Sequence, residues 1–210
     1  MIDCSVNDIR RLDHVWRYSS IPVVHTENVA QHSFYVVTYA ILIHQQLRPN
    51  DSKLLTPVIF HALTHDMIES KTGDVVRTFK YLTQELKQEI DKAEELLIGK
   101  LDPIMSSLFK LTKDQMTGWS PEGHQHIKDV VKAADFLSLF QYMRVEAIRG
   151  NAEIIPFYNR MIDDFTKIMN AALKSKNELA DFYVLLNHSA RVVINNCFSS
   201  HTVKVMDREV

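Results

Sequence analysis

Glycine and proline, the residues that most often end helices and form tight turns, are scarce in this chain. There are 5 glycines and 6 prolines among its 210 residues, about 5% together, whereas the two make up roughly 12% of an average domain. Few turn residues leave few places for the tight turns that join short strands, which argues against a β-sandwich. We therefore predict an all-α fold with long helices, and at this length one domain or a domain with an appendage.

Start and stop signals divide the sequence into helical segments joined by short connections. Asn28 is an N-cap candidate with Gln31 at the capping-box distance, and Ser120-Pro121 pairs an N-cap with a proline at the first helical position. The predicted helices span 6–17, 26 or 28 to 48, 56–73, 83–101, 120–149, 156–174 and 178–196. We expect 102–123 to hold a short helix and a loop, and 199–210 to be frayed or packed at an edge.

Charge and cysteine content restrict the partners and the compartment. The net charge of −2 provides no positive field that would attract nucleic acid. No apolar run is long enough to cross a bilayer, and the charged residues of 1–13 are unlike a secretory signal. The two cysteines, Cys4 and Cys197, form no spaced framework, which is typical of reduced thiols. We expect a cytoplasmic protein with no nucleic-acid polymer and no membrane as partner.

Three predicted helices carry polar side chains on the face that should be buried. Each continues an apolar stripe, and the residues are His32, then His65 with Asp66 and Glu69, and finally Asp135. Burying an ionised carboxylate without a partner costs more than a domain's spare stability, so Asp66 and Asp135 need a cation. Two imidazoles and two carboxylates suit a divalent transition metal. Taken singly, each is more simply a hydrogen-bonded core histidine or an exposed carboxylate; taken together, they favour a metal site.

The same ordered set resembles the HD-domain metal-dependent phosphohydrolases, in their bacterial 5′-deoxynucleotidase branch. The stretches that carry the resemblance are Arg17, HTENVAQHS at 25–33, HDMIE at 65–69, Thr72-Gly73-Asp74 with Lys80-Tyr81, and VKAAD at 131–135. Together they span roughly residues 8–151. The resemblance implies a single HD-type helical bundle over 1–210, with the HD core at about 8–151, C-terminal helices at 152–198 and a tail at 199–210.

The resemblance also implies a metal centre between helices. One divalent transition metal ion, Mn, Co or Zn, would be held by four ligands, which are His32, His65, Asp66 and Asp135. Glu69 would act as the catalytic residue that moves protons beside the ion, and its alternative role is to orient His65. His124 and His126 lie two residues apart at the start of a helix and are interpreted as surface residues.

The residues implied to bind substrate lie on both sides of the first ligand. Arg17 would hold the phosphate with its permanently charged planar fork, and Asp74 would contact the sugar and favour deoxyribose. Arg77 and Lys80 offer further phosphate contacts or form a solvated basic edge. Tyr18, which stands where that branch tends to carry tryptophan, stacks on a base or packs; both alternatives stay open.

We therefore predict an enzyme that removes the 5′-phosphate from deoxynucleoside 5′-monophosphates, and the resemblance implies a homodimer. A deoxynucleoside triphosphate hydrolase of the dATP type would use the same ligands, although the long spacing from Asp66 to Asp135 is more like that of the monophosphate enzymes. A non-catalytic helical module, stabilised by its metal and binding a nucleotide or a partner, is the alternative from another class.

Overall fold

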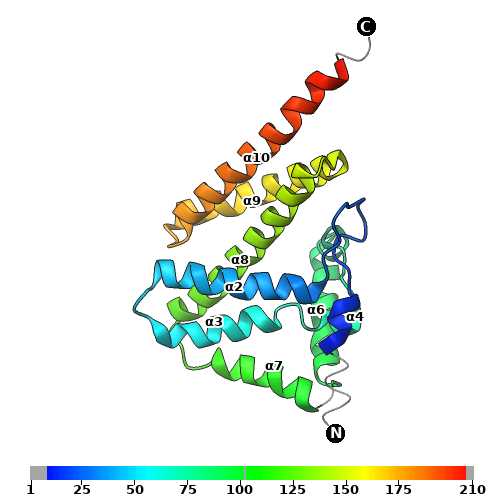
Figure 1. Cartoon of the computed structure of the whole chain (residues 1–210). Helices are drawn as coiled ribbons and strands as arrows, with labels where there is room; N and C mark the ends of the chain where they lie inside the picture. Colours follow the sequence, from blue (N-terminus) through cyan, green and yellow to red (C-terminus); the bar gives the residue numbers. More distant parts are fainter. Residues whose placement is uncertain (1–8, 102, 207–210) are drawn as a thin grey trace. The chain divides into compact units, whose positions relative to one another are not determined.

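The computed structural model describes residues 9–101 and 103–206, and this part of the chain is helical with no strand, which confirms the all-α prediction (Figure 1). An isolated antiparallel bridge joins Trp16 and Asn28. The elements in chain order are η1 Arg11–His14, α2 Val29–Leu47, α3 Ser52–Thr64, α4 Glu69–Thr72, α5 Arg77–Lys80, α6 Gln84–Ile98, α7 Pro103–Gln115, α8 Pro121–Ile148, η2 Ala152–Ile154, α9 Ile155–Ser175 and α10 Ala180–Met206.

Helix α2 begins where its capping signal predicts. The side chain of Asn28 accepts from the Gln31 N–H at 2.9 Å, while the Gln31 side chain accepts from the Asn28 N–H at 3.1 Å. This reciprocal pair satisfies two of the N–H groups that a helix start leaves open. The cap fixes the first turn of α2, and His32 lies in that turn, fully buried.

The predicted helix 56–73 is wrong at its start and in its middle. It begins earlier, at Ser52, because Asp51 caps it by accepting from the Leu54 N–H, and Pro57 is tolerated inside at the loss of one backbone hydrogen bond. It then ends at Thr64, and a turn leads into the short helix α4. Gly73 ends α4 with φ of +70°, a backbone conformation that other residues rarely adopt.

Other boundaries differ less. Of the segment predicted as helix 6–17, residues 9–10 are helical and 11–14 form the 3-10 turn η1, while 15–17 are not helical and 6–8 lie outside the described residues. The segment 102–123 holds a fuller helix, α7, than expected, and α10 continues to Met206, past the predicted end at 196.

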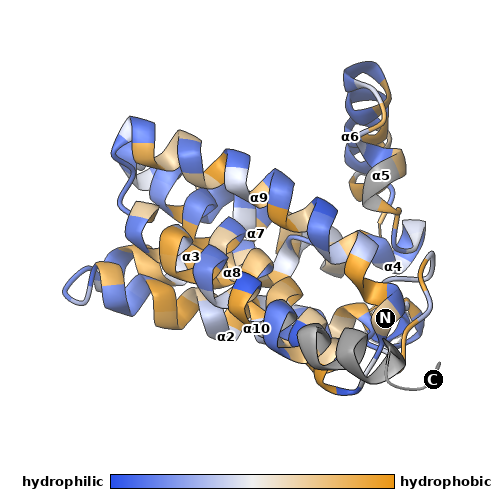
Figure 2. Cartoon of the chain, turned by 90° about the horizontal axis from the view of Figure 1, so that it is seen from above, coloured by the Kyte–Doolittle hydropathy of each residue, from blue (hydrophilic) through white to orange (hydrophobic). Residues whose placement is uncertain are grey.

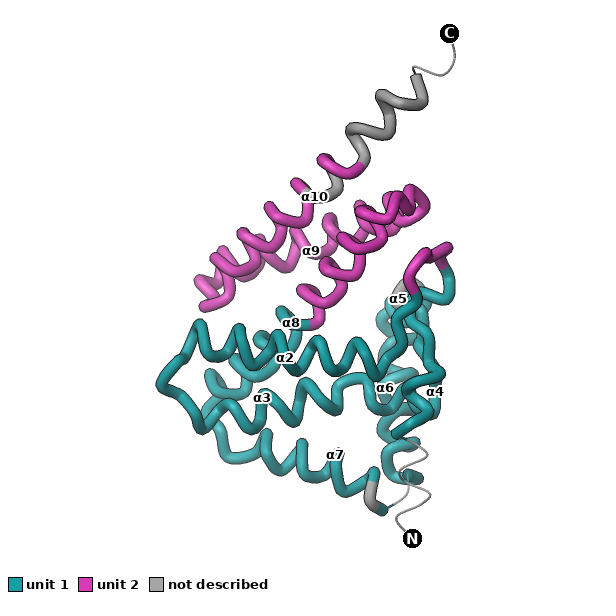
Figure 3. The backbone as a smooth tube through the Cα atoms, viewed as in Figure 1, with its two compact units in different colours: residues 1–20, 26–134 teal, residues 21–25, 135–210 magenta. Residues whose placement is uncertain are grey.

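The chain divides into two compact units, which are described separately (Figure 3). The first comprises 1–20 and 26–134, and in it α3 packs against α2 and α7. A buried pair of imidazoles, His44 Nδ1 and His126 Nε2 at 2.8 Å, also joins α2 to α8 there. His126 is therefore a core residue, and its interpretation as a surface residue is wrong.

The second unit comprises 21–25 and 135–210. Its core is aromatic: the Phe165 ring of α9 packs edge-to-face against Phe136 and Phe140 of α8 and Tyr183 of α10. Hydrophilic and hydrophobic residues are mixed along the helices, as amphipathic packing requires (Figure 2). Among the described helices, none combines the length and the apolar character needed to cross a membrane.

Candidate active site

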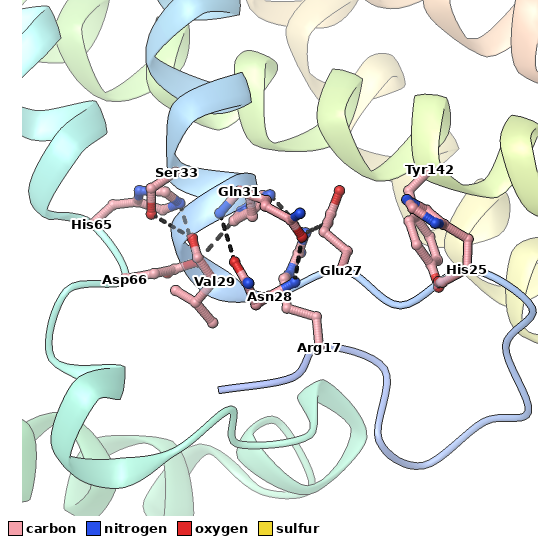
Figure 4. A network of polar contacts seen from close by, with 11 residues as sticks. Arg17, His25, Glu27, Asn28, Val29, Gln31, Ser33, His65, Asp66 and Tyr142 are labelled. Carbon is pink, nitrogen blue, oxygen red and sulfur yellow. Dashed lines mark hydrogen bonds and ion pairs between the residues drawn. The ribbon is translucent and has the colours of Figure 1, made fainter. Parts of the chain in front are cut away.

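Three of the four predicted metal ligands converge in the first unit. His32, His65 and Asp66 each offer a donor atom, and these atoms all lie within 4.8 Å of one another. The Oδ2 atom of Asp66 is 3.4 Å from His32 Nε2 and 3.2 Å from His65 Nε2. Figure 4 shows Asp66 beside His65. Two imidazole nitrogens and one carboxylate oxygen at this spacing form a donor set that fits a divalent transition metal.

The backbone of α3 sets the orientation of one ligand ring. His65 Nδ1 lies 2.7 Å from the carbonyl oxygen of Ala62, and since a carbonyl only accepts, Nδ1 donates. In the neutral ring the lone pair is then on Nε2, the nitrogen that faces Asp66. A hydrogen bond of this kind, which fixes the tautomer and the ring plane, is usual for histidine ligands in metal sites.

The carboxylate of Asp66 is held in its charged form. Burial on its own raises the pKa of this group, but His65 and His32, when protonated, outweigh it through their charge and hydrogen bonds, so the pKa lies well below its usual range. Coordination needs a deprotonated carboxylate, and Asp66 meets that need across the physiological pH range.

Asp135, the fourth predicted ligand, lies on α8 as the first residue of the second unit. It is partly buried, in line with its position on an otherwise apolar stripe. Its role as a ligand stays a prediction.

Arg17 lies beside the ligand group and makes two short contacts. Its Nη1 atom donates to Glu27 Oε1 at 2.7 Å (Figure 4). The same atom lies 2.6 Å from His32 Nδ1. A guanidinium only donates, so in this arrangement His32 Nδ1 accepts and a neutral His32 ring carries its proton on Nε2. For Nε2 to bind a metal, the proton must instead be on Nδ1, and Arg17 must give up this contact. The geometry therefore makes Arg17 a competitor of the metal for the His32 ring.

We expect Arg17→Ala to keep or increase metal affinity while lowering kcat/KM by about 10- to 100-fold, the range for a lost charge-assisted hydrogen bond of about 1.5–3 kcal/mol. The metal affinity rises or holds because one positive charge and one competing donor leave the His32 ring. Titration of the apo variant with Zn²⁺ or Mn²⁺ measures the first effect and steady-state kinetics the second. A weaker metal affinity in the variant would contradict this assignment.

Glu69 is held in its neutral form in the metal-free chain. Burial raises the pKa of Glu69 to about 9, with help from the charges of Asp66 and Asp74 and against the opposing charges of Arg17 and Lys80. Burial also raises the pKa of Asp74, although Arg17 and the N–H of Tyr18, which donates to this carboxyl, act against it. Two carboxyl groups with raised pKa values beside an arginine are typical of a site that moves protons.

The raised pKa of Glu69 predicts a pH-dependent stability difference. Between pH 4.5 and about 9 the folded chain keeps a proton that the unfolded chain releases, so this group lowers the free energy of unfolding as pH rises. We expect Glu69→Gln, measured without metal, to gain melting temperature over the wild type progressively from pH 5 to pH 8. The exposed Glu153→Gln is the matched control. A difference in melting temperature that does not vary with pH would refute the raised pKa.

Tyr18, Lys80 and Arg77, the other residues predicted to bind substrate, differ in burial and in their contacts. The Tyr18 side chain is 9% exposed, and the Arg17 guanidinium lies 4.8 Å from its ring centre, an arrangement closer to packing than to a free stacking surface. Lys80 donates to Glu94 of α6 at 2.8 Å. Arg77 begins α5, and its side chain lies outside the described part of the chain.

Sequence reasoning gave no role to Glu27, which is 5% exposed and pairs with Arg17. The signal available was its place: it directly precedes the N-cap of the helix that carries His32. A carboxylate at a buried helix start needs a cation or N–H donors, and Arg17 provides the cation.

Comparisons with known proteins bear on the family and the fold. A family model described as 5′-deoxynucleotidase YfbR-like matches residues 6–185. A 5′-deoxynucleotidase of Erwinia tasmaniensis is 27% identical over 154 residues, which cover 70% of this chain and 75% of that protein.

An HD-domain phosphohydrolase from Listeria innocua has a TM-score of 0.60 at 19% identity, and the match covers 91% of this chain and 98% of the Listeria chain. The cyanophage S-2L HD phosphohydrolase DatZ, solved with dA and one catalytic Zn²⁺ ion, has a TM-score of 0.50 at 20% identity, over 66% of this chain and 70% of its own. The two structures are similar to this chain in fold.

Proposed function

The chain belongs to the YfbR-like 5′-deoxynucleotidase family, and on this premise we propose that it releases phosphate from deoxynucleoside 5′-monophosphates. It is an HD-domain phosphohydrolase, with the all-α fold of that group. The observation that carries the proposal is the convergence of His32, His65 and Asp66 within 4.8 Å, beside the guanidinium of Arg17. A cation site next to a permanently charged fork suits a phosphate monoester.

A divalent transition metal would be held by His32, His65 and Asp66, with Asp135 as the proposed fourth ligand. The neighbour DatZ contains a catalytic Zn²⁺ ion, which supports zinc among the three candidates Mn, Co and Zn. When bound, such an ion neutralises phosphoryl charge and lowers the pKa of a water molecule from ~15.7 towards ~7–9.

The other residues act on the substrate and on protons. Arg17 binds the phosphate oxygens once it leaves His32, and Asp74 contacts the sugar. Glu69 gives its proton to the 5′ oxygen as the P–O5′ bond breaks, and it regains one from the attacking water. Arg77 supplies a further phosphate contact. Lys80 acts on the phosphate only if it leaves Glu94, and Tyr18 packs beneath Arg17.

Phosphate release from the four common deoxynucleoside 5′-monophosphates tests the proposal, with Mn²⁺, Co²⁺ or Zn²⁺ added and bound metal measured in the same samples. We expect turnover of at least one of them, and slower turnover of the matching ribonucleotide. No release from any of them by a protein with a full metal complement would contradict the proposal. With dATP, free triphosphate as product would favour the triphosphate hydrolase instead.

We also propose that the chain, as one HD-type domain, works as a cytoplasmic homodimer without a nucleic-acid polymer. Exposed apolar residues on α10, Val184, Leu185 and Val192, support a self-associating face in the second unit. The net charge of −2 supports the absence of a polyanionic partner. Sedimentation that detects only monomer at micromolar concentration would contradict the dimer.

A further inference from the structure

A loop of residues 18–26 separates Arg17 from the start of α2. Its base is closed by backbone hydrogen bonds, from the Arg17 N–H to Glu27 O at 3.0 Å and from the Val29 N–H to Val15 O at 2.9 Å. The Arg17–Glu27 ion pair lies on the same base. These contacts place Arg17 at the base of the loop, so a change in the loop that reached its base would move Arg17.

The tip of the loop is bound to the second half of α8 and the residues after it. The fully buried carboxylate of Glu146 accepts from the N–H of Val24 at 2.8 Å and from the N–H of His25 at 2.6 Å. Asn151 Nδ2 donates to Glu146 Oε2 and to Pro22 O. The Tyr142 hydroxyl donates to His25 O, and its ring lies beside the His25 ring (Figure 4). We call Glu146, Tyr142 and Asn151 the loop clamp.

Breaking the clamp costs free energy, because the side chain of Glu146 is fully buried and does not reach solvent. A buried carboxylate needs hydrogen-bond donors. Glu146 accepts hydrogen bonds from two main-chain N–H groups of the loop and from the side-chain amide of Asn151. If 21–25 moved away, the charge would lose both main-chain donors. These residues accordingly belong to the second compact unit, whereas the chain on both sides of them belongs to the first (Figure 3).

Tyr18, the residue after Arg17, has a strained backbone conformation that the loop clamp helps to maintain. Tyr18 has φ of +61°, which is rare for a residue with a large side chain and is strained. Such a conformation persists only where the surrounding structure enforces it. The loop would relax at Tyr18 if its tip were released, and Arg17 is the adjoining residue.

We propose that Glu146 is a positioning residue that, through the loop clamp, holds Arg17 in place for the substrate phosphate. This inference rests on the proposed function for the role of Arg17. Glu146 acts on substrate affinity, and its loss does not lower metal binding, since Arg17 competes with the metal for His32 and does not itself bind the metal. Tyr142 and Asn151 support the same loop with weaker effect, since each contributes neutral hydrogen bonds.

The test is Glu146→Gln, alone and in the Arg17→Ala background. Gln keeps one acceptor but turns an NH₂ group towards a loop N–H, so we expect KM to rise about tenfold, as for one lost hydrogen bond to a charged group, with kcat within threefold and metal content unchanged. In the Arg17→Ala background the same substitution should change KM less than twofold, because its effect passes through Arg17. An equal rise of KM in both backgrounds would overturn the proposal, as would a lower melting temperature with unchanged KM.

Two further variants keep the test decisive. Tyr142→Phe removes one hydroxyl and should raise KM in the same direction by a smaller factor, even if Glu146→Gln folds poorly. Glu153→Gln, an exposed side chain seven residues after Glu146, should leave KM unchanged. A KM in Tyr142→Phe equal to that of the wild type would count against the clamp.

Hydrogen exchange separates this inference from the proposed function, because it needs no substrate. In Glu146→Gln, or in Tyr142→Phe, the amides of Val24 and His25 should exchange faster, and the Arg17 amide, which donates to Glu27 O, should follow. If the Arg17 amide keeps its protection while the loop tip loses it, the clamp does not reach Arg17 and the inference fails. If the wild type turns over no nucleotide but the Arg17 amide responds, only the proposed function fails.

Discussion

Replacing Asp66 with asparagine is expected to remove metal binding and turnover together, each by roughly 10³-fold. Asp66 Oδ2 lies between the two imidazole nitrogens, 3.4 Å from His32 Nε2 and 3.2 Å from His65 Nε2. Asparagine keeps the shape and one oxygen but has no negative charge. Loss of one charged partner at a buried site costs about 3–5 kcal/mol, which corresponds to 10²- to 10³-fold or more in affinity.

Bound metal after dialysis and phosphate release, measured on the same preparation, check this expectation. Asparagine has no ionisable group, so raising the pH should not rescue the loss. Asp114→Asn on α7, an exposed carboxylate of the same unit, is the matched control and should keep both properties. A full metal complement in Asp66→Asn would show that the cation is held elsewhere.

Local signals in the sequence predicted much of the fold. The Asn28–Gln31 box starts α2, Thr83 caps α6 by accepting from the Leu86 N–H, and Ser120 directly precedes α8, whose first residue is Pro121. Each signal is a short-range hydrogen bond or a fixed backbone angle, so it acts whatever the distant chain does. The break after Thr64 has no such signal, because residues 65–68 carry the apolar pattern of a continuing helix and no glycine or proline.

The candidate site was predictable where a polar residue interrupts an apolar stripe. His32, His65 and Asp66 were found in this way, and the structure brings them together. Contacts between distant segments leave no such mark. Glu146 and His25 are 121 residues apart and His44 and His126 are 82 apart, so neither pairing could be read from local periodicity. The sequence indicates that each buried polar residue needs a partner, but only the folded structure shows which residue that partner is.

Glu69→Gln is expected to lower kcat by about 10²- to 10⁴-fold, the usual contribution of a positioned proton donor or acceptor, while metal content stays full. Glu69 follows Asp66 in the turn that becomes α4, with its N–H donating to Asp66 O at 3.0 Å, so it lies beside the ligands without belonging to their group. Its pKa is raised by burial and by neighbouring carboxylates, and glutamine reproduces the size and neutrality of the protonated form without a transferable proton.

Three outcomes are informative when kcat, KM and bound metal are measured for this variant against the exposed Glu153→Gln. A large fall in kcat with full metal assigns the proton transfer to Glu69. Loss of metal along with activity would make Glu69 a ligand, or a support for His65, and would contradict the expectation. Wild-type kcat in the variant would contradict it too, because the hydrolysis would then take its proton from another group. The non-catalytic module, by contrast, predicts no turnover in either protein, so wild-type activity that depends on Glu69 separates an enzyme from a domain whose metal is only structural.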